Sequence, residues 1–132
     1  MSLQFSFGPA SGGEPMPVIP ITLRDGAGHT TAILSAILDT GSDGTFAPLS
    51  LLRAAGFQAG RQRGHLFTTR TEVLPEVVIG YALTLTIGPL ELAGATVFGS
   101  REIAEVILGR DMLNQLVFTY DGPRRVLDLL SP

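Results

Sequence analysis

The sequence predicts a mainly β protein that folds as one closed β domain with one or two short helices. Most of its apolar residues occur in short runs of strand type, separated by turns that contain glycine or proline. The length of 132 residues fits one compact domain, which is large enough to bury a core but too short for two domains. We find no internal repeat and no linker between residues 17 and 132, so a single domain is the simplest interpretation.

The chain is predicted to begin with a lead-in and a hairpin. Residues 1–16 contain the glycine- and proline-rich stretch Gly8 to Gly13 and are predicted as a flexible lead-in. Pro17 to Leu23 and Thr30 to Leu38 are rich in aliphatic and β-branched residues. The turn signal between them, Arg24 to Gly28, predicts that these two strands form a hairpin.

A short helix and a polar segment follow. Pro48 to Ala55 is predicted as a helix, because proline suits a first turn and Gly56 suits the position just past the end. We expect this helix to pack under a functional site rather than to form it. The stretch from Arg61 to Thr71 is polar and predicts an exposed hairpin or loop.

The second half of the chain is predicted to consist mainly of strands. Val77 to Ile87 ends in a clear alternation of apolar and polar residues, and Gly88-Pro89 turns the chain into a further strand, Leu90 to Phe98. Gly99 to Glu105 is predicted as a loop. The last elements are a buried run, a short helix and two closing strands: Val106 to Gly109, Arg110 to Gln115, Val117 to Tyr120 and Arg125 to Leu130.

The composition excludes several kinds of chemistry. There are no cysteines, so disulfides, zinc-thiolate sites and cysteine nucleophiles cannot form. All nine basic residues are arginine, so neither a P-loop lysine nor a Schiff-base lysine is present. His29 and His65 are the only histidines, and we predict no metal site and no cofactor from them. The net charge of −3 argues against nucleic acid as a partner.

We expect a soluble, cytoplasmic protein. The apolar runs are too short, and too often broken by glycine, proline or charge, to span a bilayer, so no membrane partner is predicted. The stretch from Met1 to Pro17 does not combine a basic start with an apolar core, and therefore does not predict a secretory signal.

The stretch from Ile37 to Gly44 organises the chain. Asp39 stands at the end of the apolar run from Ala32 to Leu38, so its carboxylate is predicted to leave a buried strand and enter a tight turn. As a bare tripeptide, Asp-Thr-Gly is also common in ordinary turns that end a strand. The residues on either side of this tripeptide are more specific than the tripeptide itself.

Two separated motifs resemble those of the retropepsin-like aspartic proteases, the family of retroviral proteases and their cellular and bacterial relatives. Leu38-Asp39-Thr40-Gly41-Ser42-Asp43 is similar to the catalytic turn of that family. Val106-Ile107-Leu108-Gly109-Arg110-Asp111-Met112-Leu113 is similar to the segment that packs against this turn. The likeness in the order of elements runs from about Val18 to Leu130. It implies a closed β-barrel of the acid-protease type and the activity of an aspartic endopeptidase.

The resemblance also implies a homodimer that cleaves a peptide or protein. Pepsin-like members of the wider class carry two turns of this type in one long chain, whereas Asp39 lies in the only one here. Each subunit would supply one Asp39 carboxylate to the site. Two carboxylates in contact share one proton, so that one can activate water while the other protonates the departing nitrogen.

Further roles follow from the resemblance for residues beside Asp39. Thr40 would interlock with its mate across the two-fold axis, and Gly41 would let the backbone lie close to the carboxylates. The Ser42 hydroxyl could donate a hydrogen bond to the carboxylate and stabilise its ionised form. Leu108 and Gly109 would support the turn from the second motif.

An ion pair between Asp43 and Arg110 is implied behind the site, in a partly buried position. Two independent surface charges are the alternative. Asp111 lies next to Arg110 in the sequence and could compete for the same guanidinium.

The flap of the family, a mobile hairpin that closes over substrate, corresponds in position to a segment that consists of Leu66, Phe67, Thr68, Thr69, Arg70 and Thr71. Viral members have a glycine-rich flap tip. Here Gly64 is the only glycine between Gly60 and Gly80, so an ordinary exposed hairpin stays an alternative.

Two other functions stay open at the level of sequence. One is a non-catalytic retropepsin-like β-domain that serves dimerisation or peptide binding. The other is a domain of a longer protein whose flap works only in that context. The intact turn from Asp39 to Gly41, together with Leu108-Gly109, favours the enzyme, because a binding domain has no need for a buried aspartate that is costly to desolvate.

Overall fold

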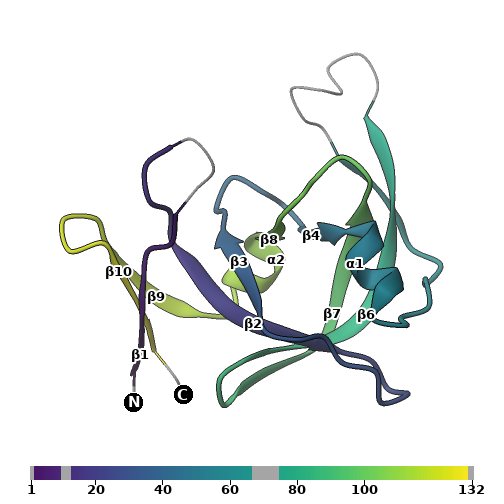
Figure 1. The fold of residues 1–132 in the computed structure, drawn as a ribbon, viewed down its shortest axis with the longest axis horizontal. Helices are drawn as coiled ribbons and strands as arrows, with labels where there is room; N and C mark the ends of the chain where they lie inside the picture. The colour runs from purple at the N-terminus through teal and green to yellow at the C-terminus, as the bar shows by residue number, and fades with distance from the viewer. Residues whose placement is uncertain (1, 10–12, 67–74, 131–132) are drawn as a thin grey trace.

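The computed structural model describes residues 2–9, 13–66 and 75–130. Within these residues six strands pair in the order β2-β3-β8-β4-β7-β6, and β2 also pairs with β6, so the sheet closes into a barrel (Figure 1). The six strands are β2 Val18–Arg24, β3 Leu34–Leu38, β4 Thr45–Pro48, β6 Glu76–Ile87, β7 Leu90–Ser100 and β8 Val106–Leu108. This arrangement confirms the predicted closed, mainly β fold.

The alternation of side chains along the strands fills the barrel. Ile19, Ile21 and Leu23 of β2 are almost completely buried, as are the predicted inward positions of β6, Leu83, Leu85 and Ile87. The β2–β6 pair that closes the barrel is antiparallel, and the hydroxyl groups of Thr22 and Thr86 form a hydrogen bond across it. Closure leaves the barrel strands without a long exposed edge on either side of this seam.

Two short helices flank the barrel in the described part of the chain, as predicted. The first, α1 Leu49–Ala54, buries Leu49 and Leu52. It packs closely on β7, where a Cβ atom at Gly99 would lie 2.8 Å from Leu49 Cδ1. The second, α2 Arg110–Leu113, follows β8 and buries Met112 and Leu113.

A second sheet lies beside the barrel in Figure 1 and contains three strands, β1 Ser2–Ser6, β10 Val126–Leu130 and β9 Val117–Asp121. Its strands pair antiparallel, with Phe5 opposite Leu127. Leu127 and Leu129 are buried against the barrel core. The lead-in predicted for residues 1–16 is therefore wrong for Ser2–Ser6. The signal was present, because Leu3 and Phe5 alternate with polar residues and pack on the core.

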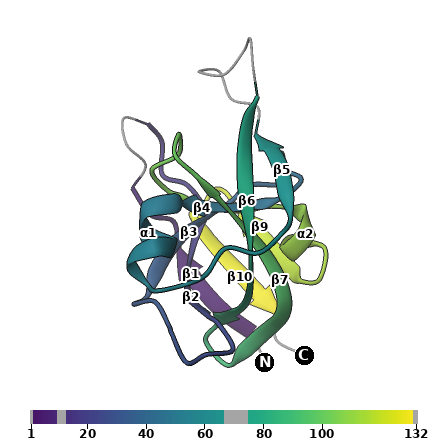
Figure 2. The ribbon, with the colours of Figure 1, turned by 90° about the vertical axis from the view of Figure 1, so that its right-hand side faces the viewer.

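The hairpin formed by β5 Arg63–Leu66 and the start of β6 extends beyond the barrel (Figure 2). Its register places His65 opposite Val77 and Leu66 opposite Glu76. A hairpin in this region is what the polar stretch from Arg61 predicts. Phe67, Thr68, Thr69, Arg70 and Thr71, which belong to the predicted flap, lie outside the described residues.

Candidate active site

Asp39 lies where two parallel strands end side by side. Strand β3 pairs with β8 in parallel, with Leu38 opposite Leu108. The Asp39 N–H continues this ladder and donates to the Leu108 carbonyl oxygen at 3.0 Å. Leu38 is buried and Asp39 is half-buried, so the carboxylate leaves the barrel core at this point, as the sequence predicts.

The turn after Asp39 folds back on its carboxylate. Asp39 Oδ1 accepts a hydrogen bond from the Gly41 N–H at 2.9 Å, and the Asp39 carbonyl oxygen accepts one from the Ser42 N–H at 3.2 Å. A Cβ atom at Gly41 would lie only 3.1 Å from Asp39 Oδ1. Glycine therefore permits the close approach of backbone and carboxylate, and Thr40 between them is exposed.

The second motif locks against this turn through backbone contacts. The Arg110 N–H donates to the Ser42 carbonyl oxygen at 2.8 Å, and the Asp111 N–H donates to the Asp43 carbonyl oxygen at 3.2 Å. A Cβ atom at Gly109 would lie 2.1 Å from the Gly44 carbonyl oxygen. Only glycine fits at this contact, which explains physically why the second motif contains it.

Thr45 links the two motifs from inside the barrel. Its side chain is fully buried, and its hydroxyl donates to Asp111 Oδ1 at 2.7 Å and accepts from the Gly109 N–H at 3.2 Å. No pattern in the sequence predicts this residue. The expectation that Asp111 competes for Arg110 is wrong, because Asp111 Oδ1 accepts from Thr45 and from the Met112 N–H at 2.9 Å.

Arg110 pairs with Asp43, as the two motifs imply. Its Nη2 donates to Asp43 Oδ1, and its Nη1 donates to the Thr40 carbonyl oxygen at 2.7 Å. In the single chain the pair lies at the surface, since the side chain of Asp43 is 93% exposed and that of Arg110 is 44% exposed. An exposed ion pair of this kind contributes little to the stability of the fold. The hydrogen bond from Arg110 to the Thr40 carbonyl oxygen connects the second motif directly to the turn after Asp39.

A pocket of about 350 Å³ opens at this turn. It is lined by Asp39, Gly41, Ser42, Asp43, Gly44, Phe46, His65, Leu66, Ile103 and Ile107. The pocket brings Asp39 together with Leu66, the described residue of the predicted flap. Phe46, Ile103 and Ile107 make much of its surface apolar, which suits the side chains of a peptide. The lining contains no residue of α1.

Comparisons with known proteins address the fold. Neither the protein-family models nor the curated proteins yield a match to the sequence. Among solved structures, EIAV protease in complex with the inhibitor HBY-793 matches with a TM-score of 0.57 and 18% identity, over 80% of this chain and 92% of that chain. The chain has the retropepsin-like aspartic protease fold.

Two further structures share this retropepsin-like fold. A retropepsin-like aspartic protease from Rickettsia conorii matches with a TM-score of 0.55 and 18% identity, over 86% of this chain and 92% of that chain. The retroviral protease-like domain of Ddi1 from Leishmania major matches with a TM-score of 0.56 and 16% identity, over 85% and 86%. At these identities the likeness establishes the fold, and it confirms the fold that the two motifs imply.

Within the retropepsin-like barrel, one expected hydrogen bond is absent from its predicted place. The Ser42 hydroxyl donates to the Gly44 carbonyl oxygen at 2.7 Å and thereby stabilises the turn, whereas the expected acceptor was the Asp39 carboxylate. The Gly44 carbonyl oxygen is closer to Ser42 in the sequence than Asp39 is. It is the preferred acceptor, because short polar side chains readily form hydrogen bonds to nearby main-chain groups.

The stretch from Ile37 to Gly44, the second motif and the predicted flap contain seven of the ten lining residues, whereas none of them contains Phe46, His65 or Ile103. Phe46 lies in β4, a strand that was not predicted because it is only four residues long and its last residue, Pro48, begins the helix signal. Ile103 lies in the loop after β7, where no periodic pattern marks it.

Among the helices of the described ranges, none has the length and apolar character needed to cross a membrane.

Proposed function

We propose that this chain is an aspartic endopeptidase that acts as a homodimer and hydrolyses peptide bonds through two Asp39 carboxylates. The observation that carries the proposal is the place of Asp39, at the end of β3 and in the wall of a pocket, within the retropepsin-like fold. The alternative, a non-catalytic β-domain for dimerisation or peptide binding, is not favoured by any contact among the described residues.

The chemistry requires two carboxylates that share one proton. Like charges in contact cannot both ionise easily, so in aspartic proteases one group stays ionised and the other stays protonated over a useful range of pH. The ionised carboxylate takes a proton from water as the water attacks the peptide carbonyl, and the acid protonates the leaving nitrogen. One chain contains a single Asp-Thr-Gly turn, so a second copy would supply the second aspartate.

The neighbours of Asp39 would fix its position in this reaction. Leu108 and Gly109 hold the turn through its backbone, since Leu108 accepts the Asp39 N–H and Gly109 allows the two motifs to touch. Gly41 donates to the carboxylate oxygen and so fixes the orientation of the carboxylate. Thr40 is exposed next to Asp39 and would meet its mate across the two-fold axis.

The pocket suggests the class of substrate. Leu66, Phe46, Ile103 and Ile107 would contact apolar side chains next to the cleaved bond. A flap formed by Leu66 and the five residues after it stays a prediction, as do the cytoplasmic location and the absence of a nucleic-acid partner.

Cleavage of a peptide library by the purified protein tests this function. We expect cleavage between apolar residues in mildly acidic buffer, and a fall of about 10³-fold or more in Asp39→Asn, which keeps the shape of the side chain but removes the base and the titrating acid. Glu91→Gln is a matched control, because it neutralises an exposed carboxylate on β7.

Circular dichroism and sedimentation should show the same fold and the same dimer in the Asp39→Asn protein. Cleavage that persists in this variant would overturn the assignment of Asp39. A parent protein that forms dimers and binds peptides without cleaving them would favour the non-catalytic domain instead.

A further inference from the structure

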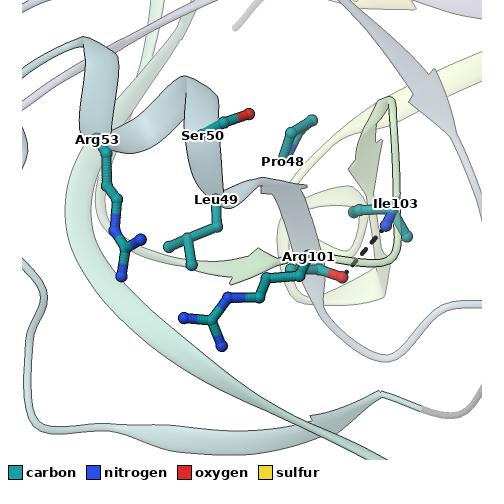
Figure 3. Close-up of a pocket in the computed structure, with 7 residues that line it drawn as sticks. Pro48, Leu49, Ser50, Arg53, Arg101 and Ile103 are labelled. Carbon is teal, nitrogen blue, oxygen red and sulfur yellow. Dashed lines mark hydrogen bonds between the residues drawn. The ribbon is translucent and has the colours of Figure 1, made fainter.

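The loop of residues 101–105, between β7 and β8, separates two hollows. Ile103 lines the pocket of about 350 Å³ that contains Asp39. It also lines a second pocket of about 280 Å³, together with Pro48, Leu49, Ser50, Arg53, Ser100 and Arg101. Figure 3 shows this second pocket, with Ile103 facing residues of α1 across it. The loop is therefore a thin partition between α1 and the candidate active site.

Packing alone fixes the position of this loop only weakly. Residues of the barrel core are fixed by close contact with neighbours on all sides, whereas Ile103 borders a hollow on two sides and is only half-buried. The position of the loop must then depend on its polar contacts.

Ser100 provides these contacts from the end of β7. Its side chain is only 1% exposed, and its Oγ accepts hydrogen bonds from the Glu102 N–H at 3.0 Å and from the Ile103 N–H at 3.3 Å. The bond to Ile103 is the dashed line in Figure 3. The hydroxyl proton is donated to Glu76 Oε1 at 2.6 Å, so the bonding capacity of Ser100 Oγ is fully used.

Glu76 completes the anchor from β6, the strand that pairs with β7. It is the first residue of β6, and its Oε2 accepts the Arg101 N–H at 2.8 Å while its Oε1 binds Ser100. In the β5–β6 hairpin, Glu76 lies opposite Leu66, which lines the same pocket as Asp39. One carboxylate thus joins two segments that contribute to the pocket lining, the hairpin and the loop.

We propose that Glu76 is a positioning residue which, through Ser100, holds Ile103 at a fixed distance from the hairpin and so sets the size of the substrate side chain that the pocket accepts. This inference rests on the proposed function. With the anchor removed, Ile103 can move toward the hollow beside α1, and the pocket then admits larger side chains but holds smaller ones less well.

Two peptides that differ only in one residue next to the cleaved bond test this proposal, one with leucine and one with tryptophan. In Glu76→Ala we expect the KM for the leucine peptide to rise about tenfold, because two charge-assisted hydrogen bonds are lost, with little change in kcat. The ratio of kcat/KM for the tryptophan peptide to that for the leucine peptide should rise. Ser100→Ala should act alike, and the double variant should show less than the sum of the two effects.

Two variants serve as controls. Glu76→Gln keeps one acceptor oxygen and should restore part of the parent selectivity. Glu102→Ala removes an exposed carboxylate from the same loop, while the Glu102 N–H stays bonded to Ser100, so it should leave the selectivity unchanged.

Two results would overturn the proposal while the parent still cleaves peptides. One is unchanged selectivity and KM in Glu76→Ala. The other is an equal loss of kcat/KM for both peptides that merely follows a loss of thermal stability. If the parent cleaves nothing, the proposed function fails, and hydrogen exchange still tests the anchor. The amides of Arg101 and Ile103 should exchange faster in Glu76→Ala, and unchanged exchange would refute the anchor itself.

Discussion

The candidate site is built from two regions that are held in different ways. The turn from Asp39 to Thr45 and its partner segment from Leu108 to Asp111, together called the floor, are joined by backbone hydrogen bonds and by a contact at Gly109 that leaves no room for a side chain. The loop of residues 101–105, called the side wall, depends on the side chains of Glu76 and Ser100 and borders hollows on both faces.

Under the proposed function, this difference would separate the residues that carry out the reaction from those that select the substrate. Backbone bonds hold an atom within the narrow limits that a reaction requires, because they do not depend on a flexible side chain. A wall fixed by two side chains can shift with a single substitution. We infer that the floor tolerates little change, whereas the side wall can vary to fit different substrates.

Gly109→Ala should have the largest effect, because it breaks the floor. The new Cβ would lie 2.1 Å from the Gly44 carbonyl oxygen, and neither backbone segment can move without breaking the hydrogen bonds between the motifs. We expect a loss of about 3 kcal/mol or more in the free energy of unfolding, measured by urea denaturation. Gly26→Ala is the matched control, since its new Cβ would have no atom within 4 Å apart from those of its chain neighbours. Equal stability of the two variants would contradict the tight contact.

Thr45→Val should have a smaller effect on the same region. Valine keeps the volume but removes the buried hydroxyl, so the Gly109 N–H and Asp111 Oδ1 each lose a partner. The expected loss is about 1–3 kcal/mol in the free energy of unfolding. Thr45→Ser keeps the hydroxyl and should lose less. If serine proves the more damaging replacement, the methyl group rather than the hydrogen bonds holds the floor at this point.

Asp25→Asn should have the smallest effect and no effect on cleavage, since Asp25 organises a turn outside the pocket. Partial burial disfavours its charge, but hydrogen bonds from the His29 side chain and from the His29 and Ala27 N–H groups outweigh this and lower the pKa of Asp25. A lowered pKa stabilises the fold above the ordinary value of about 4 and less so as the pH falls below it. The variant should therefore be slightly less stable than the parent at pH 7, with a difference that shrinks below about pH 4 in thermal unfolding. A difference that is constant with pH would contradict this.

Local sequence patterns predicted most of the barrel and part of the floor. The alternation in β6 and the turn signals around β2 report which residues neighbour one another along the chain, and such neighbours determine strands and hairpins. The second sheet was missed at β1, whose partner β10 lies at the far end of the chain. The pairing of Asp43 with Arg110 followed from the motifs, but its exposure depends on the surface that surrounds it.

The contacts that pattern could not predict join distant residues. Thr45 and Gly109 are 64 positions apart, and Glu76 and Ser100 are 24 positions apart. Neither pair produces a periodic pattern in the sequence, because each hydrogen bond forms only when the barrel brings the strands together. The same holds for Ile103, which enters the pocket through the path of a loop.

Subunit mixing tests most directly whether two copies of Asp39 form one catalytic site. Parent and Asp39→Asn proteins are mixed in equal amounts, at constant total concentration well above the dimer dissociation constant, and allowed to exchange subunits before peptidase activity is measured. A shared site predicts about one quarter of the activity of the same total concentration of parent, because only parent-parent dimers are active. An activity of about one half would show that each chain cleaves peptides with its own Asp39 alone, and would contradict the shared site.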